Sequence, residues 1–123
     1  MRMAVSKNFY RDEFACRCGC GFDTVDATLV QGLQRLRDIL KAPIHVNSGC
    51  RCKKHNTGQG GSPKSQHLTG KAADIRVDGK HPEEVAAIAA MLSEFANSGI
   101  GIYDTFTHLD VRNGKSRWDI RTR

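Results

Sequence analysis

The sequence predicts a small α+β domain in which two main helices pack on a small, mainly antiparallel sheet. Three observations lead to this fold class: two segments with helical periodicity, short segments of alternating apolar residues between them, and a length of 123 residues. A chain of this length is sufficient for one hydrophobic core of modest size. We therefore expect a single domain over residues 1–123.

The first helix is expected over residues 26–40. Apolar residues recur along it at helical spacing: Leu29, Leu33, Leu36 and Leu40, with Val30 and Ile39 beside them. Pro43 should prevent the helix from continuing, and the residues that follow, 44–47, predict a short strand.

Residues 48–71 are expected to form a long loop without regular structure. They contain five glycines, three serines and a proline, with almost no apolar side chain. A loop of this length in a small domain is usually functional. The segment that follows, KAADIRVDG, predicts a strand whose alternation separates Asp74 from the apolar residues Ile75 and Val77.

A second helix is expected from Pro82 to about residue 97, with Glu83 and Glu84 in its first turn. The next segment, IGIYDTFTHLDVRNG, predicts a hairpin with its turn near Asp104. In the second arm of this hairpin, His108 and Asp110 share the face opposite the apolar residues.

The charge of the chain favours an acidic partner. Nineteen Lys and Arg against thirteen Asp and Glu give a net charge of +6. Nucleic acid and an anionic cell-wall polymer are both acidic partners, and charge alone does not choose between them. Basic and aromatic residues do not alternate as they do where bases stack, so we do not expect nucleic acid to be the main partner. No apolar run of about 18 residues predicts a membrane span, and the N-terminus lacks the apolar segment of a secretory signal. We expect a monomer that is made in the cytoplasm.

Three side chains form a candidate zinc site. His67 lies at the end of the long loop, and Asp74 and His108 lie on the polar faces of two predicted strands. Two imidazoles and one carboxylate leave the fourth position of a tetrahedral zinc open, which is typical of a catalytic site. Zinc in such a site activates water for attack on an amide carbonyl.

Five cysteines form two clusters in the sequence: Cys16, Cys18 and Cys20 in CRCGCG, and Cys50 and Cys52 in GCRC. Four of the five are sufficient for two disulfides or for a structural zinc across two short loops. Free thiols are a third interpretation. The spacing alone does not distinguish these three states.

The motifs SGCRCKKHN, GGSPKSQHLTGKAADI and IGIYDTFTHLDVR resemble those of the D-alanyl-D-alanine carboxypeptidase family of zinc peptidases. This family includes peptidoglycan carboxypeptidases and phage endolysins, and its fold is similar to that of the Hedgehog signalling domain. The most specific match is Ser-x-His-x-x-Gly-x-Ala-x-Asp, which runs from Ser65 to Asp74. NFYRDEFACRCGCG and LQRLRDILKAPIHVNSG extend the resemblance over nearly the whole chain.

The resemblance implies roles for individual residues. It makes His67, Asp74 and His108 the ligands of Zn²⁺, and it makes Arg51 a group that binds substrate or stabilises the oxyanion. Ser65 would contact substrate near the metal or cap the loop.

The general base is where the chain departs from the family. Many members have an acid three residues before the last histidine, where this chain has Thr105. We expect Asp110 to act as the base or to orient the metal site, with Asp104 as the second choice. Cys50 stands where the family usually has a tyrosine, which makes a disulfide between the two cysteine clusters plausible, at about 2–4 kcal/mol per bridge.

These observations together predict a zinc metallopeptidase that cleaves stem peptides of peptidoglycan, such as a phage or prophage endolysin released by a separate pore. Two alternatives belong to other classes. One is a non-catalytic wall-binding module of the same fold, in which zinc is structural. The other is a cysteine-zinc module that binds nucleic acid, with an affinity that falls steeply with salt.

Overall fold

A five-stranded sheet forms the centre of the computed structural model, which describes residues 2–122. In spatial order its strands are β3 (Ile44–Ser48), β4 (Ala72–Val77), β6 (Thr107–Asp110), β5 (Gly99–Ile102) and β7 (Ser116–Asp119). The β5–β7 pair is parallel, and the other three pairs are antiparallel. The predicted α+β class with a mainly antiparallel sheet is confirmed.

The first predicted helix is α1 (Ala27–Leu40). The carboxylate of Asp26 caps it by accepting hydrogen bonds from two backbone N–H groups of the first turn. The three leucines at the centre of the apolar stripe are fully buried: Leu29, Leu33 and Leu36. Ile39, at the edge of this stripe, is 51% exposed. The helix ends at Lys41, whose backbone adopts the left-handed conformation with φ 53°.

Two short helices, α3 (Pro82–Ala89) and α4 (Ser93–Ala96), replace the single helix expected over residues 82–97. The N–H groups of Met91 and Leu92 bond to carbonyls three residues back, which tightens the last turn of α3. Leu92 then adopts an extended backbone. The prediction of one continuous helix was wrong: the chain leaves the helix at residues 90–92, and Leu92 and Phe95 both lie in the core.

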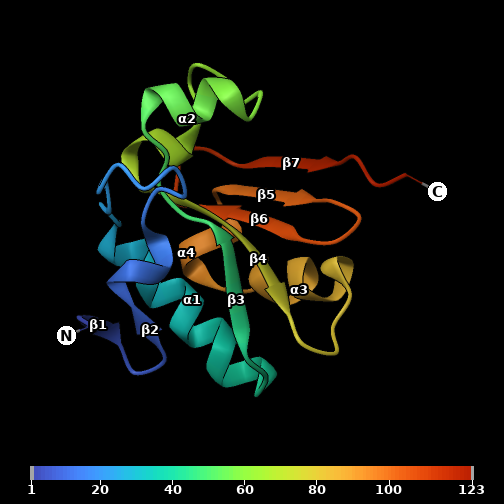
Figure 1. Ribbon diagram of the computed structural model, residues 1–123. Helices are drawn as coiled ribbons and strands as arrows, with labels where there is room; N and C mark the ends of the chain where they lie inside the picture. The colour runs from blue at the N-terminus through green and yellow to red at the C-terminus, as the bar shows by residue number, and fades with distance from the viewer. Residues whose placement is uncertain (1, 123) are drawn as a thin grey trace.

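The sheet separates an apolar layer from a polar face. Figure 1 shows α1, α3 and α4 together on one side of the sheet and α2 (Lys53–Gly58) on the other. Ala73, Ile75 and Leu109 belong to the core cluster with the leucines of α1. Asp74 and His108 are therefore presented on the opposite face, as the alternation predicted. No helix within residues 2–122 is long and apolar enough to cross a membrane.

The N-terminal segment adds elements that the sequence did not predict. β1 (Ala4–Ser6) pairs with β2 (Phe9–Tyr10), and η1 (Arg11–Phe14) follows as a 3₁₀ helix. The Phe14 carbonyl accepts a hydrogen bond from the Cys50 N–H. A Cβ at Gly49 would lie 2.5 Å from the same carbonyl oxygen, so glycine permits this close approach. The N-terminal segment thereby supports the loop that follows β3.

The segment 48–71 is not structureless, contrary to the sequence-based expectation. It contains α2 and the 3₁₀ helix η2 (Gln66–Thr69). Asn56 is buried, and its side-chain amide donates to the Ser62 carbonyl. The Asn56 backbone carbonyl accepts from the Gly61 N–H. Hydrogen bonds rather than apolar packing hold this segment, which explains why hydrophobic periodicity did not reveal it.

Glu94 joins α4 to α1, and we expect it to contribute to stability in a pH-dependent way. Its carboxylate accepts from Arg35 Nη1 at 2.7 Å and from Gln31 Nε2 at 2.9 Å. Burial alone would raise the pKa of Glu94, but these hydrogen bonds hold it below its ordinary value. The stabilisation is therefore present above about pH 4.3, the unfolded pKa, and is lost as the pH falls through the lower folded pKa.

Glu94→Gln should lower the free energy of unfolding by about 1–2 kcal/mol at pH 7, because Arg35 is partly exposed and screened. The loss should become smaller as the pH falls below about 4.3 and through the lower folded pKa. Denaturant unfolding at several pH values measures this difference. Glu83→Gln, which alters an exposed carboxylate, is the control and should change less. An equal loss at all pH values would contradict the role of the Glu94 charge.

Candidate metal and catalytic site

Three predicted residues converge on the polar face of the sheet. η2 carries His67, β4 carries Asp74, and β6 carries His108 directly opposite Asp74 in the strand register. One ligand atom from each lies within 4.8 Å of the others, and all three side chains are buried. Asp74 Oδ1 is 3.3 Å from His67 Nε2 and 2.9 Å from His108 Nδ1. The structure thus brings the predicted ligand set together.

The orientation of His67 is determined by the segment around it. Its Nδ1 lies 2.6 Å from the Gly49 carbonyl oxygen, which can only accept, so Nδ1 carries the proton and Nε2 is free to bind a metal. Gly70 ends η2 with a left-handed φ of 69°, and a Cβ there would lie 2.5 Å from the Thr24 carbonyl oxygen. Glycine at this position therefore permits the turn from His67 into β4.

His108 is held between two carboxylates. Its Nδ1 faces Asp74, and its Nε2 lies 2.8 Å from Asp110 Oδ2. Asp110 is fully buried and also accepts from the Gly99 N–H and from the Arg112 guanidinium. A Cβ at Gly99 would lie 2.2 Å from Asp110 Oδ2, so the absence of a side chain makes room for this carboxylate. Asp110 contacts the ring nitrogen of His108 that points away from Asp74.

The charges of these groups are strongly coupled. Burial alone would raise the pKa of Asp74, but hydrogen bonds from His108 and His67 hold it well below its usual range. Burial would likewise raise the pKa of Asp110, and His108 and Arg112 lower it. Burial lowers the pKa of His108, but the two carboxylates raise it above its ordinary value. Asp74 is therefore an anionic ligand at neutral pH.

The three ligand atoms fit a zinc ion. For bonds of about 2.0–2.1 Å, two ligands of a tetrahedral zinc are separated by about 3.3 Å. The separations from Asp74 Oδ1 to His67 Nε2 and His108 Nδ1, 3.3 and 2.9 Å, are close to this length. Two imidazole nitrogens and a carboxylate oxygen are also the donors that zinc accepts in catalytic sites.

A cleft of about 260 Å³ opens above these ligands. Arg51 lines it and is only 14% exposed; its Nη2 lies 3.3 Å from Asp74 Oδ2. Its other donors are held by Ser48 Oγ and Asn56 Oδ1, and its backbone N–H bonds to the His67 carbonyl. The predicted arginine is thus fixed beside the candidate metal site.

A family model described as Peptidase M15 matches residues 7–110. The chain belongs to the peptidase M15 family. The match spans every element that contributes to the candidate metal site, and it confirms the resemblance to D-alanyl-D-alanine carboxypeptidases. M15 peptidases depend on zinc, in agreement with the His-Asp-His group. A search of the curated proteins found no significant match.

The far wall of the M15 cleft comes from residues that the sequence did not single out. Trp118 on β7 donates from Nε1 to the Tyr103 hydroxyl, and its ring centroid lies 5.0 Å from that of His108. A Cβ at Gly101 would lie 2.2 Å from Trp118 Nε1, so glycine makes room for the indole. Arg112 also lines the cleft, with its guanidinium 5.3 Å from the Trp118 ring.

The remaining predicted residues lie in different places. Ser65 lines the cleft, and its Oγ caps η2 by accepting from the His67 N–H. Asp104 lies in the hairpin turn, is exposed, and accepts two hydrogen bonds from Thr122. Asp104 does not line the cleft. The structure therefore does not bring the second-choice base to the metal ligands.

The cysteines occupy two different environments and are all thiols in the structure. Cys50 is buried with its Sγ against the Phe22 carbonyl, and burial raises the pKa of its thiol to about 11. Cys16 lies close to the thiols of Cys18 and Cys52. Burial would raise the pKa of Cys16, but hydrogen bonds from the backbone and thiols of Cys18 and Cys52 lower it to about 7.

Proposed function

We propose that this M15 peptidase hydrolyses peptide bonds in the stem peptides of peptidoglycan, as a carboxypeptidase or an endopeptidase. The observation that carries the proposal is the convergence of His67, Asp74 and His108 below a cleft lined by Arg51. When bound, zinc supplies Lewis-acid catalysis, which polarises the substrate carbonyl and activates water. His67 Nε2, Asp74 Oδ1 and His108 Nδ1 are the atoms that would hold it.

Asp110 positions His108 rather than acting as the general base. It is fully buried, it does not line the cleft, and Arg112 and the Gly99 N–H already occupy its oxygens. A carboxylate on the second ring nitrogen of a metal-binding histidine fixes the orientation of the ring and raises its basicity. Of the two roles expected for Asp110, the geometry favours the orienting one.

Cationic groups in the cleft support a substrate that carries carboxylates. Arg51 and Arg112 both line the cleft, and the whole chain carries a net charge of +6. Stem peptides have free carboxylates, and a guanidinium pairs with a carboxylate through two parallel hydrogen bonds. Trp118 and Tyr103 add aromatic side chains to the same cleft. Positive charge also favours attachment to anionic wall polymers after release, as expected for a phage or prophage endolysin.

Asp110→Asn should lower the rate of hydrolysis and the zinc affinity by about 10–100-fold, because it weakens the orientation of His108. Zinc titration and the separate values of kcat and KM measure the effect. Asp119→Asn, which alters a partly exposed carboxylate on β7, is the control. If Asp110 were the general base, Asp110→Asn would leave the zinc affinity unchanged and lose almost all of kcat. That result would contradict the orienting role.

Digestion of purified peptidoglycan tests the proposed function. Zinc-loaded protein, chelated protein and chelated protein with zinc restored are compared, and the fragments are identified by mass spectrometry. New peptide ends that need zinc are expected, and their masses identify the bond that is cut.

The second candidate function is a non-catalytic wall-binding module. Among the described residues that line the cleft, Asp74 is the only carboxylate, so no other carboxylate of the cleft is left to act as a general base. Binding to the wall without new peptide ends would support that candidate and contradict the peptidase.

A further inference from the structure

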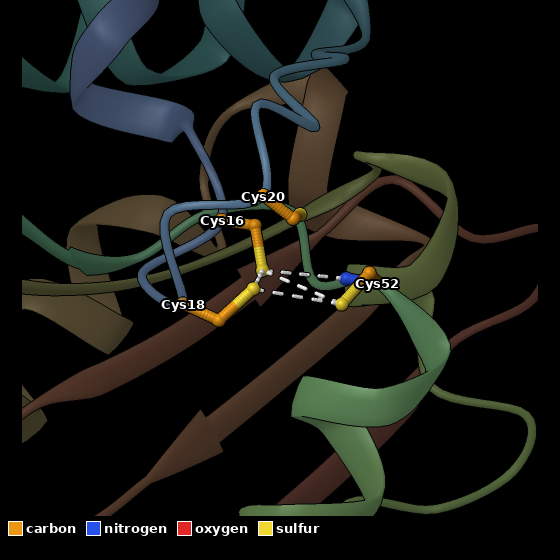
Figure 2. A group of neighbouring side chains, drawn as sticks. All are labelled: Cys16, Cys18, Cys20 and Cys52. Atoms are coloured by element: carbon orange, nitrogen blue, oxygen red, sulfur yellow. Dashed lines mark hydrogen bonds between the residues drawn. The ribbon is translucent and has the colours of Figure 1, made fainter.

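Four cysteines from two distant parts of the chain meet beside the cleft loop. Cys16, Cys18 and Cys20 lie in the loop after η1, and Cys52 is the residue immediately before α2. Their sulfur atoms all lie within 4.8 Å of one another. Figure 2 shows the sulfurs of Cys16, Cys18 and Cys52 directed toward a common point. The remaining cysteine, Cys50, is directed toward the Phe22 carbonyl instead.

The distances between these sulfurs match the edges of a metal-centred tetrahedron. Cys16 Sγ is 3.4 Å from Cys18 Sγ and 3.9 Å from Cys52 Sγ, and the Cys18–Cys52 pair is separated by 3.7 Å. Four sulfurs at about 2.3 Å from a tetrahedral zinc are separated from one another by about 3.8 Å. We propose that Cys16, Cys18, Cys20 and Cys52 bind a structural Zn²⁺, separate from the His67–Asp74–His108 site.

The surrounding backbone suits a group of thiolates. The N–H of Cys52 donates to Cys16 Sγ, and the N–H of His55 donates to Cys52 Sγ. Such hydrogen bonds stabilise negative charge on the sulfurs and fix their positions. Gly19 and Gly21 have left-handed φ values of 81° and 90°, which allow the loop to turn between successive cysteines.

Binding of zinc by these four thiols needs no oxidant. Four thiols release four protons to solvent, and the four thiolates bind one Zn²⁺ to give a centre with a net charge of −2. Cys18 and Cys20 are exposed, so the ion can reach the site from solvent. Arg17 and Lys53 are each next to a ligand in the chain, so the sequence around the ligands is basic.

The position of this centre gives it a structural role. It would connect the N-terminal loop to Cys52, whose neighbour Arg51 lines the M15 cleft. The two loops are already in contact through the Cys50 N–H and the Phe14 carbonyl. A zinc ion across them would hold the start of α2 and the backbone of Arg51 in place, whether or not the protein cleaves peptidoglycan.

Native mass spectrometry and X-ray absorption at the zinc edge test the proposal on the full chain purified without chelator. The intact protein should carry two zinc ions. His67→Ala should keep one, surrounded only by sulfur at about 2.3 Å. Cys18→Ser should lose the sulfur-bound ion and retain one with nitrogen and oxygen ligands at about 2.0–2.2 Å. These measurements are independent of hydrolysis, so they are informative even where the proposed peptidase function fails.

Cys50→Ser is the matched control, because it replaces a cysteine of the same loop that lies outside the cluster, and it should keep both ions. The mass of the intact protein detects disulfides, each of which removes two hydrogens. A disulfide among the four cysteines, or zinc in His67→Ala without a sulfur shell, would overturn the proposal. Because His67→Ala leaves all four cysteines unchanged, the test remains decisive where Cys18→Ser does not fold.

Discussion

Replacing Asp74 with asparagine is expected to remove zinc from the His67–Asp74–His108 group and to abolish peptide hydrolysis. Asp74 supplies the only negative charge of this group, and its Oδ1 is 3.3 Å from His67 Nε2 and 2.9 Å from His108 Nδ1. An asparagine amide has no charge and presents either an oxygen or an NH₂ group. Metal ions contribute several kcal/mol to the stabilisation of a transition state, so the rate should fall by about 10³-fold or more.

Zinc content by mass spectrometry and the rate of peptide release measure the effect of Asp74→Asn. Asp78→Asn is the matched control, since Asp78 follows the same strand and also contacts a histidine, but its side chain is 54% exposed. The control should keep its zinc and its activity. Wild-type zinc content together with wild-type activity in Asp74→Asn would exclude Asp74 as a ligand.

The sequence was sufficient to predict that Asp74 and His108 come together on one face, because simple alternation governs the two strands that carry them. Ile75 and Leu109 must face the helices, so their neighbours Asp74 and His108 face away from the core. Neighbouring strands of a small sheet then bring two such residues close together. The prediction that His67 joins them also needed the Ser-x-His-x-x-Gly-x-Ala-x-Asp motif. The conformation of η2 depends on Gly70 rather than on an apolar pattern.

The far wall of the cleft could not be predicted in the same way. Trp118 reaches His108 because β7 pairs in parallel with β5, and the four residues of β7 have no continuous apolar pattern. Room for the indole depends on Gly101, which appears in the sequence only as an interruption of a strand. The role of Asp110 was also ambiguous, because a base and an orienting carboxylate have the same residue type and spacing. Its burial and its contact with His108 Nε2, which favour the proposed orienting role, are not visible in the sequence.

Removing the Arg51 side chain is expected to lower kcat/KM by about 10²–10³-fold while zinc remains bound. The guanidinium lines the cleft 3.3 Å from Asp74 Oδ2, where it can reach a substrate oxygen next to the metal ligands. Arg51→Ala measures the loss of kcat/KM. Arg51→Lys should recover part of it, since lysine keeps the positive charge but lacks the planar guanidinium with its paired N–H donors. Arg76→Ala removes an exposed arginine from the same strand as Asp74 and should have little effect.

The division of this loss between kcat and KM identifies what Arg51 contacts. A guanidinium that stabilises the oxyanion acts only in the transition state, so its removal would lower kcat with little change in KM. A guanidinium that binds a substrate carboxylate acts equally in the ground state, so its removal would raise KM. The first result would place the scissile carbonyl beside Arg51, and the second would favour a peptide with a free carboxylate near the cut bond. Unchanged kinetics in Arg51→Ala would exclude both roles.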